Sequence, residues 1–212
     1  MDLESETGKF LNVLLEKYVP GGRPLTDKNV LADAVEQWTL DALFYSSKTT
    51  NEDLWRGLTV VGDEIPVFLY RVVRAMYCAD YPEDSLYKIS WLMKTLSAVE
   101  IYWNTEIGTG FKVWHGLGTV IGSRIKVGQG FQIHHGCTVG HRDMSVGVRG
   151  PEIGDNVILY ANSEILGSIF VGSNVTIGCN LTIQSDLPSD SRVFRPSIRT
   201  YDEKLNSKSY EP

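Results

Sequence analysis

All four histidines of the chain lie in one short stretch, and they are the groups best suited to chemistry there. His115, His134, His135 and His141 fall within 27 of the 212 positions. An imidazole changes its charge near neutral pH and also binds transition metals, so this concentration indicates either a proton-transfer site or a metal site. Which of the two kinds of site is present depends on how the surrounding secondary structure positions the four rings.

A six-residue repeat runs through the region that carries the histidines. An aliphatic marker residue recurs twelve times, and seven of the twelve are followed directly by glycine. The markers are Ile107, Val113, Ile121, Val127, Ile133, Val139, Ile153, Leu159, Ile165, Val171, Ile177 and Ile183. The steps are six residues, except for one of eight after Val113 and one of fourteen after Val139. Such a period predicts a parallel β-helix, in which short strands turn at regular corners and each coil pairs with the coil below.

The first 97 residues follow a helical pattern instead. Apolar residues recur at helical spacing over 10–19, 29–45, 65–77 and 85–96, separated by breakers such as PGGRP and DYPED. We therefore expect an α+β chain: an α-helical domain at 1–97 that serves oligomerisation, a β-helix at 98–195 and a C-terminal tail at 196–212.

The repeat resembles that of the hexapeptide acyltransferases, whose left-handed parallel β-helix has a triangular section with three hexads to a coil. The resemblance implies that every third marker lies on the same face, about 4.8 Å higher in the stack. The residues two positions after one such set of markers then form a column of His115, His135, Ala161 and Cys179. The two long steps predict bulges at corners, where solenoids carry much of their chemistry.

Residues 99–199 resemble serine acetyltransferase in particular. The stretch VEIYWNTEIGTGFKVWHGLGTVIG is similar to that family's VDIHP and DHxTGIVVG motifs, and CTVGHRDMSVGVRGPEIGDNV is similar to its VTLGGTGKxxGDRHPKI motif. The resemblance implies a cytoplasmic enzyme of cysteine biosynthesis that transfers acetyl from acetyl-CoA to the hydroxyl of serine or a serine-like amino acid. It makes His115 the general base, a role that suits imidazole, and Glu100 the acid that orients it.

The same resemblance implies the binding residues. For the acceptor carboxylate this is Arg149, while Trp114 and His135, which lie beside His115 in the expected stack, are further candidates for acceptor binding. Those for the pantetheine arm of the cofactor, in a groove between two subunits of a trimer, are Gly140, His141, Ala161 and Cys179. We expect a homotrimer or a dimer of trimers, with a small molecule as substrate.

Several residues depart from the family pattern. Trp114 replaces an acid that contacts the amino group of serine, and Gly150 replaces a second active-site histidine. The sequence FRPS, with Phe194 and Ser197, replaces smaller residues near the cofactor. The chain ends in SYEP and lacks the isoleucine by which that family docks into cysteine synthase, so this complex is not predicted.

Three alternatives remain open. A sugar O-acetyltransferase of the same fold fits the loss of two amino-acid contacts. The sequence HGCTVG resembles the γ-class carbonic anhydrases, but Gly130 and Gln129 stand five residues before His135 and His134, where a third zinc ligand is needed. We therefore expect no metal. An inactive trimeric scaffold is the third alternative.

Composition and charge exclude other classes. The net charge of −6 and the pI of about 5.2 argue against a nucleic-acid partner. No apolar run approaches the roughly 20 residues that a membrane span needs, and the start MDLESETGKF lacks the pattern of a signal peptide. Cys78, Cys137 and Cys179 are an odd number without CxxC spacing, which is typical of a reducing compartment.

Overall fold

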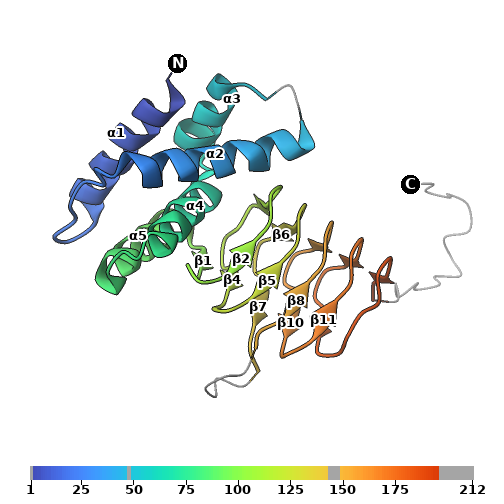
Figure 1. The fold of residues 1–212 in the computed structure, drawn as a ribbon. Helices are drawn as coiled ribbons and strands as arrows, with labels where there is room; N and C mark the ends of the chain where they lie inside the picture. Colours follow the sequence, from blue (N-terminus) through green and yellow to red (C-terminus); the bar gives the residue numbers. More distant parts are fainter. Residues whose placement is uncertain (1, 47–48, 143–148, 196–212) are drawn as a thin grey trace, which may run out of the picture.

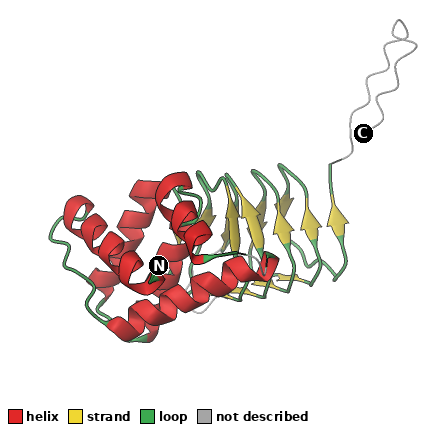
Figure 2. Ribbon diagram, turned by 90° about the horizontal axis from the view of Figure 1, so that it is seen from above, coloured by secondary structure: helices red, strands yellow, loops and turns green. Residues whose placement is uncertain are grey.

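A computed structural model describes residues 2–46, 49–142 and 149–195 of the chain. Helices gather at one end of the molecule, and a stack of short strands extends away from them (Figures 1 and 2). The helices are α1 (Leu3–Tyr18), α2 (Lys28–Tyr45), α3 (Asn51–Arg56), the π-helix η1 (Gly57–Val61), α4 (Ile65–Cys78) and α5 (Glu83–Ser97).

Local sequence signals explain where the helices begin. The side chain of Asp2 accepts a hydrogen bond from the backbone of α1, and Asp27 does the same for α2. Thr50 and Asp53 form a reciprocal capping box at α3. The expected four helices are present as α1, α2, α4 and α5, whereas α3 was missed because its six residues are too few to show a period.

The strands are short, and they form three parallel sheets. They are β1 (Glu100–Ile101), β2 (Glu106–Ile107), β3 (Lys112–Trp114), β4 (Val120–Ile121), β5 (Lys126–Val127), β6 (Gln132–His134), β7 (Thr138–Gly140), β8 (Glu152–Ile153), β9 (Ile158–Leu159), β10 (Glu164–Leu166), β11 (Phe170–Val171), β12 (Thr176–Ile177), β13 (Thr182–Ile183) and β14 (Arg192–Val193). Sheet A has the order β1-β4-β7-β10-β13, sheet B β11-β8-β5-β2 and sheet C β14-β12-β9-β6-β3.

This topology confirms the prediction of a parallel β-helix behind N-terminal helices. Successive strands enter sheets A, B and C in turn up to β13, so each of these coils contributes one strand to each sheet. Between β13 and β14, the sheet B position is taken by an isolated bridge of Leu187 to Val171. All twelve marker residues lie in strands and are buried, and Ile121, Ile133 and Val139 have no exposed surface. The marker side chains therefore fill the interior, and the residues beside them face outward.

The helices and the first coil are joined by a buried ion pair. Arg71 of α4 donates two hydrogen bonds to the carboxylate of Asp41 on α2, at 2.8 and 2.7 Å, and two more to the carbonyls of Ile107 and Gly108. The Asp41 carboxylate also accepts from the backbone amides of Gly110 and Phe111. Burial raises the pKa of Asp41, while Arg71 and the two amides act in the opposite direction. Since all these donors point at the carboxylate, we treat the pair as ionised.

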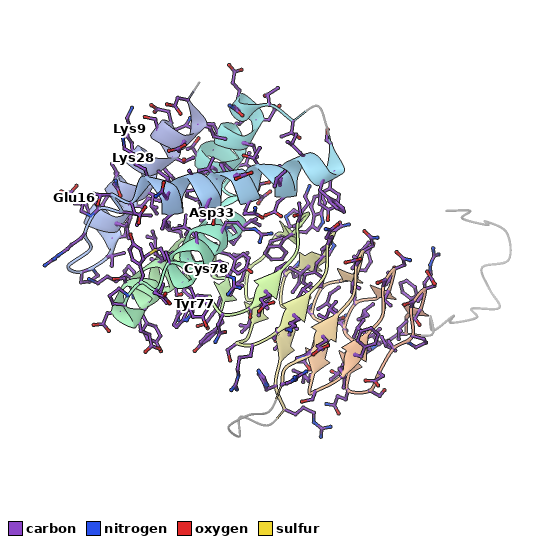
Figure 3. The ribbon with its side chains drawn as sticks, viewed as in Figure 1. Lys9, Glu16, Lys28, Asp33, Tyr77 and Cys78 are labelled. Atoms are coloured by element: carbon purple, nitrogen blue, oxygen red, sulfur yellow. The ribbon has the colours of Figure 1, made fainter. Side chains whose placement is uncertain are left out.

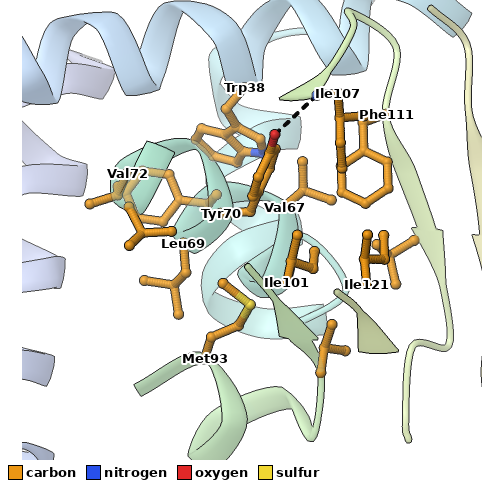
Figure 4. Packing of buried hydrophobic residues seen from close by; sticks show 14 of the residues in the cluster. Trp38, Val67, Leu69, Tyr70, Val72, Met93, Ile101, Ile107, Phe111 and Ile121 are labelled. Carbon is orange, nitrogen blue, oxygen red and sulfur yellow. Dashed lines mark hydrogen bonds between the residues drawn. The ribbon is translucent and has the colours of Figure 1, made fainter. Parts of the chain in front are cut away.

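Apolar packing reinforces this joint. The hydroxyl of Tyr70 on α4 donates to the carbonyl of Thr105 and accepts from the amide of Ile107, while its ring meets Phe111 edge to face. Figure 4 shows Trp38, Leu69 and Met93 from the helices in one cluster with Ile101 and Ile121 from the coils. Helices and β-helix thus share one hydrophobic core.

Candidate active site

The expected column that begins with His115 and His135 runs along one edge of the stack. We call the turn that leads from a sheet C strand to a sheet A strand the C–A corner. His115, His135, Ala161 and Cys179 occupy this corner in four successive coils. The backbone connects them, because Gly136 donates to Leu117 at 2.9 Å, Asn162 to His135 at 2.9 Å and Asn180 to Ala161 at 3.0 Å.

His115 begins the widest of these corners. Its side chain is exposed, and its φ of +52° lies in the left-handed region that non-glycine residues rarely adopt. The two extra residues of the corner turn Leu117 outward, where it is 67% exposed although its counterparts in other coils face inward. A side chain on Gly116 would clash with Val99, at 2.8 Å from its Cγ2. The bulge therefore presents the imidazole to solvent on a backbone held close to the preceding coil.

Glu100 lies in that preceding coil, next to the same corner. The amide of Gly118 donates to the carbonyl of Ala98 at 2.9 Å, and the amide of Glu100 donates to the carbonyl of Thr119 at 3.0 Å. Its carboxylate Oε1 is paired with Nζ of Lys94 on α5, at 3.0 Å. Among the described residues no hydrogen bond joins Glu100 to His115, so the orienting role remains a prediction.

Aromatic rings form a second ladder beside the histidine column. Trp114 stacks on His134 with ring centroids 6.2 Å apart, and His134 stacks on Tyr160 at 4.8 Å. Nζ of Lys112 lies 4.0 Å from the centre of the Trp114 ring, and the indole Nε1 donates to Oε1 of Gln132. The ring at position 114 is therefore held in place, and it supplies an aromatic edge next to His115.

Two groups near the column have shifted pKa values. Partial burial lowers the pKa of His134, and the neighbouring His135 and His115 lower it further. Burial raises the pKa of the Cys137 thiol, which points toward the backbone carbonyl of Tyr160 at 3.2 Å. The stack thus favours the neutral form of His134, and the core favours the thiol form of Cys137.

Arg149 lies at a different corner of the chain. We call the turn that leads from a sheet A strand to a sheet B strand the A–B corner, and Arg149 belongs to the one between β7 and β8. Its side chain is 83% exposed and 3.5 Å from the carboxylate of Glu152. No described contact links it to His115. Most of the inserted segment before it, residues 143–148, lies outside the described residues.

The four residues expected at the cofactor are also divided between corners. Ala161 and Cys179 lie at the C–A corner, whereas Gly140 ends β7 and His141 starts the A–B corner. Nε2 of His141 is 2.6 Å from the carbonyl of Ser123 in the coil below, and Nδ1 is buried without a partner among the described residues. One chain therefore places these four residues on opposite edges of sheet A.

Within the described ranges, no group of three or more His, Cys, Asp and Glu side chains could hold a metal ion. No helix in the described part of the chain is both long and apolar enough to cross a membrane.

Comparison with known proteins relates this arrangement to characterised enzymes. No family model matches the chain. Serine acetyltransferase of Helicobacter pylori is 36% identical over 112 residues, which are 53% of this chain and 66% of that protein. Serine acetyltransferase of Staphylococcus epidermidis is 39% identical over 105 residues, which are 50% of this chain and 49% of that protein. The chain thus matches from about half to just under two thirds of the length of these relatives.

Solved structures extend the likeness in fold to nearly the whole chain. Serine acetyltransferase of Neisseria gonorrhoeae superposes with a TM-score of 0.77 at 23% identity, covering 99% of this chain and 85% of that one. The Brucella abortus enzyme in complex with coenzyme A gives a TM-score of 0.74 at 19% identity, covering 94% and 81%. The stacked coils behind a helical end define a class of fold, the one seen in hexapeptide-repeat acyltransferases. Within that class, the particular proteins that this chain resembles are the serine acetyltransferases.

Two features of the site were not foreseen from the sequence. Lys94 reaches Glu100 only because α5 ends at Ser97 and Ala98 reverses the chain with a φ of +53°. The stacking of His134 between Trp114 and Tyr160 could have been found, because all three residues directly follow a marker residue in successive coils.

Proposed function

We propose that the chain transfers an acetyl group from acetyl-CoA to the hydroxyl of serine or a serine-like amino acid. The observation that carries this proposal is the position of His115. It is exposed at the widened corner of the stack, and the sequence around it resembles the segment that carries the catalytic histidine of serine acetyltransferases. The structural likeness extends from this corner to the helices.

The chemistry needs one base and a site for the developing negative charge. His115 would accept the hydroxyl proton while the hydroxyl oxygen attacks the thioester carbonyl carbon. As the tetrahedral intermediate collapses, the carbon–sulfur bond breaks and the imidazolium returns the proton to the sulfur of CoA. Glu100 would hold the other ring nitrogen and stabilise the imidazolium, and backbone amides of the corners would serve the oxyanion.

The division of the binding residues over two corners supports a site between subunits. If the C–A corner of one chain faces the A–B corner of its neighbour, His115 and Arg149 come to the same groove, and so do Cys179 and His141. We therefore propose a trimer, or a dimer of trimers joined through the helices. We also retain the proposal of a cytoplasmic location, which rests on cysteine usage.

A sugar hydroxyl is the second candidate acceptor, and the aromatic ladder favours it. Trp114 takes the place of an acid that would bind an ammonium group, and its ring is held by Lys112 and Gln132. The faces of aromatic rings pack against the apolar C–H face of a sugar, whereas a small zwitterion offers them little apolar surface.

An acceptor panel tests the proposal. Release of the CoA thiol from acetyl-CoA is measured with serine, homoserine, threonine and a set of sugars. We expect serine or a serine-like amino acid to react fastest, whereas turnover with sugars alone would move the assignment to the second candidate. Zinc in the purified protein would point to a hydratase. Failure of CoA to raise the melting temperature would favour a scaffold without activity.

Substitution of the proposed base gives a sharper test. His115→Ala should lower kcat by about 100-fold or more, because general-base catalysis contributes at least that much. The melting temperature should change little, since the side chain is exposed. Lys126→Ala, an exposed change on sheet B, is the matched control and should retain activity. Activity of His115→Ala equal to that of the unaltered chain would remove the assigned base.

A further inference from the structure

The pair of Lys94 and Glu100 is placed where it can influence His115. Lys94 lies in the last turn of α5, and its Nζ is 3.0 Å from Oε1 of Glu100. The two side chains are 46% and 31% exposed. Among the described residues, Lys94 is the only side chain hydrogen-bonded to this carboxylate.

The backbone that carries this pair is fixed to the corner that carries His115. Ala98, which ends α5, donates to the carbonyl of Lys94 at 3.0 Å and accepts from the amide of Gly118 at 2.9 Å. Two residues later, Glu100 donates to the carbonyl of Thr119. The end of the helix, the first strand and the bulge thus form one hydrogen-bonded unit, and a change at Lys94 has a short path to the imidazole.

The carboxylate of Glu100 and the imidazole of His115 each have a hydrogen-bonding atom without a partner among the described residues. Lys94 occupies Oε1 of Glu100, while Oε2 has no hydrogen-bond partner among the described residues. The His115 ring likewise makes no side-chain hydrogen bond within that part of the chain. A carboxylate held at one oxygen by an ammonium group has fewer rotamers open to it, so its other oxygen is better placed to orient an imidazole.

We propose that Lys94 is a positioning residue for the acyl transfer: it anchors Glu100 through Oε1, so that Oε2 orients the ring of His115. The inference rests on the proposed function, in which His115 is the base. It ties the C-terminal turn of α5 to the chemistry, since the anchor is supplied by the helical part of the chain.

Kinetics of a double-mutant cycle test the coupling. Lys94→Met should lower kcat about two- to fivefold, because an exposed ion pair is worth up to about 1 kcal/mol, and should leave the acceptor KM unchanged. Lys94→Arg should restore most of the loss. In a Glu100→Gln background, Lys94→Met should have no further effect, because the anchor acts only through the carboxylate. An unchanged or increased kcat, or equal losses in both backgrounds, would overturn the proposal.

The chain offers a matched control. Lys9 on α1, which lies away from the β-helix (Figure 3), pairs with Glu6 at 2.7 Å and is also exposed. Lys9→Met removes a similar surface pair without touching the site, so it should leave kcat unchanged. A loss equal to that of Lys94→Met would show that the effect is general and would count against the anchor.

A second measurement does not depend on activity. The ¹⁵N resonances of the His115 ring, assigned by comparison with His115→Ala, report its tautomer at alkaline pH. We expect one tautomer in the unaltered chain and a mixture in Lys94→Met and Glu100→Gln. A mixture already present in the unaltered chain would refute the anchor, even if no acceptor were ever found. One tautomer in the unaltered chain and a mixture in both variants, without transferase activity, would uphold the anchor and reject the proposed function. One tautomer that persists in Lys94→Met would overturn the anchor.

Discussion

At the scale of single residues, the aromatic rings of Trp114 and His134 form the surroundings of the proposed base. Both follow a marker residue, and their rings stack with Tyr160 along the edge that carries His115. The His134 ring has dispersion contacts with its neighbours only while it stays in the stack. Protonation gives the ring a charge, and burial of a charged group is unfavourable because it loses contact with water. The ladder should therefore respond to acid.

This response can be predicted from the lowered pKa of His134. A folded-state pKa below the unfolded value means that the unfolded chain binds more protons. The contribution of His134 to stability is therefore intact above the unfolded pKa of about 6.5 and is lost as the pH falls from there through the lower pKa of the folded state. We expect the melting temperature to fall between pH 7.5 and 5.5, and to fall less in His134→Phe, which keeps an aromatic ring but cannot be protonated. Parallel pH profiles of the two proteins, measured by thermal unfolding, would contradict this.

At the scale of the elements, the ion pair between the helices and the first coil is the contact whose loss should destabilise the fold most. Arg71 and Asp41 are 5% and 3% exposed, and together they bind the backbone of residues 107–111. A helix bundle lying on a solenoid end needs such polar contacts, because the first coil presents backbone groups that have no coil below to pair with.

Removing one partner of this pair should be costly. Arg71→Met leaves the Asp41 carboxylate buried without its counter-ion, and we expect a loss of about 3–5 kcal/mol in the free energy of unfolding, measured with urea. The double change Asp41→Leu with Arg71→Met removes both charges and should cost less than Arg71→Met alone. A double variant that is no more stable than the single one would show that the backbone contacts matter more than the charges.

At the scale of the whole molecule, the shared core predicts cooperative unfolding. The buried cluster extends without interruption from Leu3 in α1 to Ile183 in β13. Helical circular dichroism should therefore change at the same temperature as the fluorescence of a label attached to an exposed position in the coils. Two separate transitions would show that helices and coils are independent units.

The sequence predicted the parts of this molecule that repeat. The burial of Ile121 or Val139 follows from a period that twelve markers share, and the column from His115 to Cys179 follows from counting hexads. The contact of Lys94 with Glu100 could not be predicted in this way, because it depends on how one helix ends. The same holds for Asp41 and Arg71, which are 30 residues apart on two helices and show no pattern.

The uniform rise of the coils also fixes the spacing of residues along each edge of the stack. Each coil displaces the next residue of the C–A edge by about 4.8 Å, so the distance from His115 to Cys179 is set by the number of coils between them. Duplicating one coil beyond β9 would lengthen this edge by one increment while leaving the corner of His115 untouched. The length of the C–A edge and the geometry of the corner that holds His115 are thus independent in this architecture, and either can be altered while the other is kept.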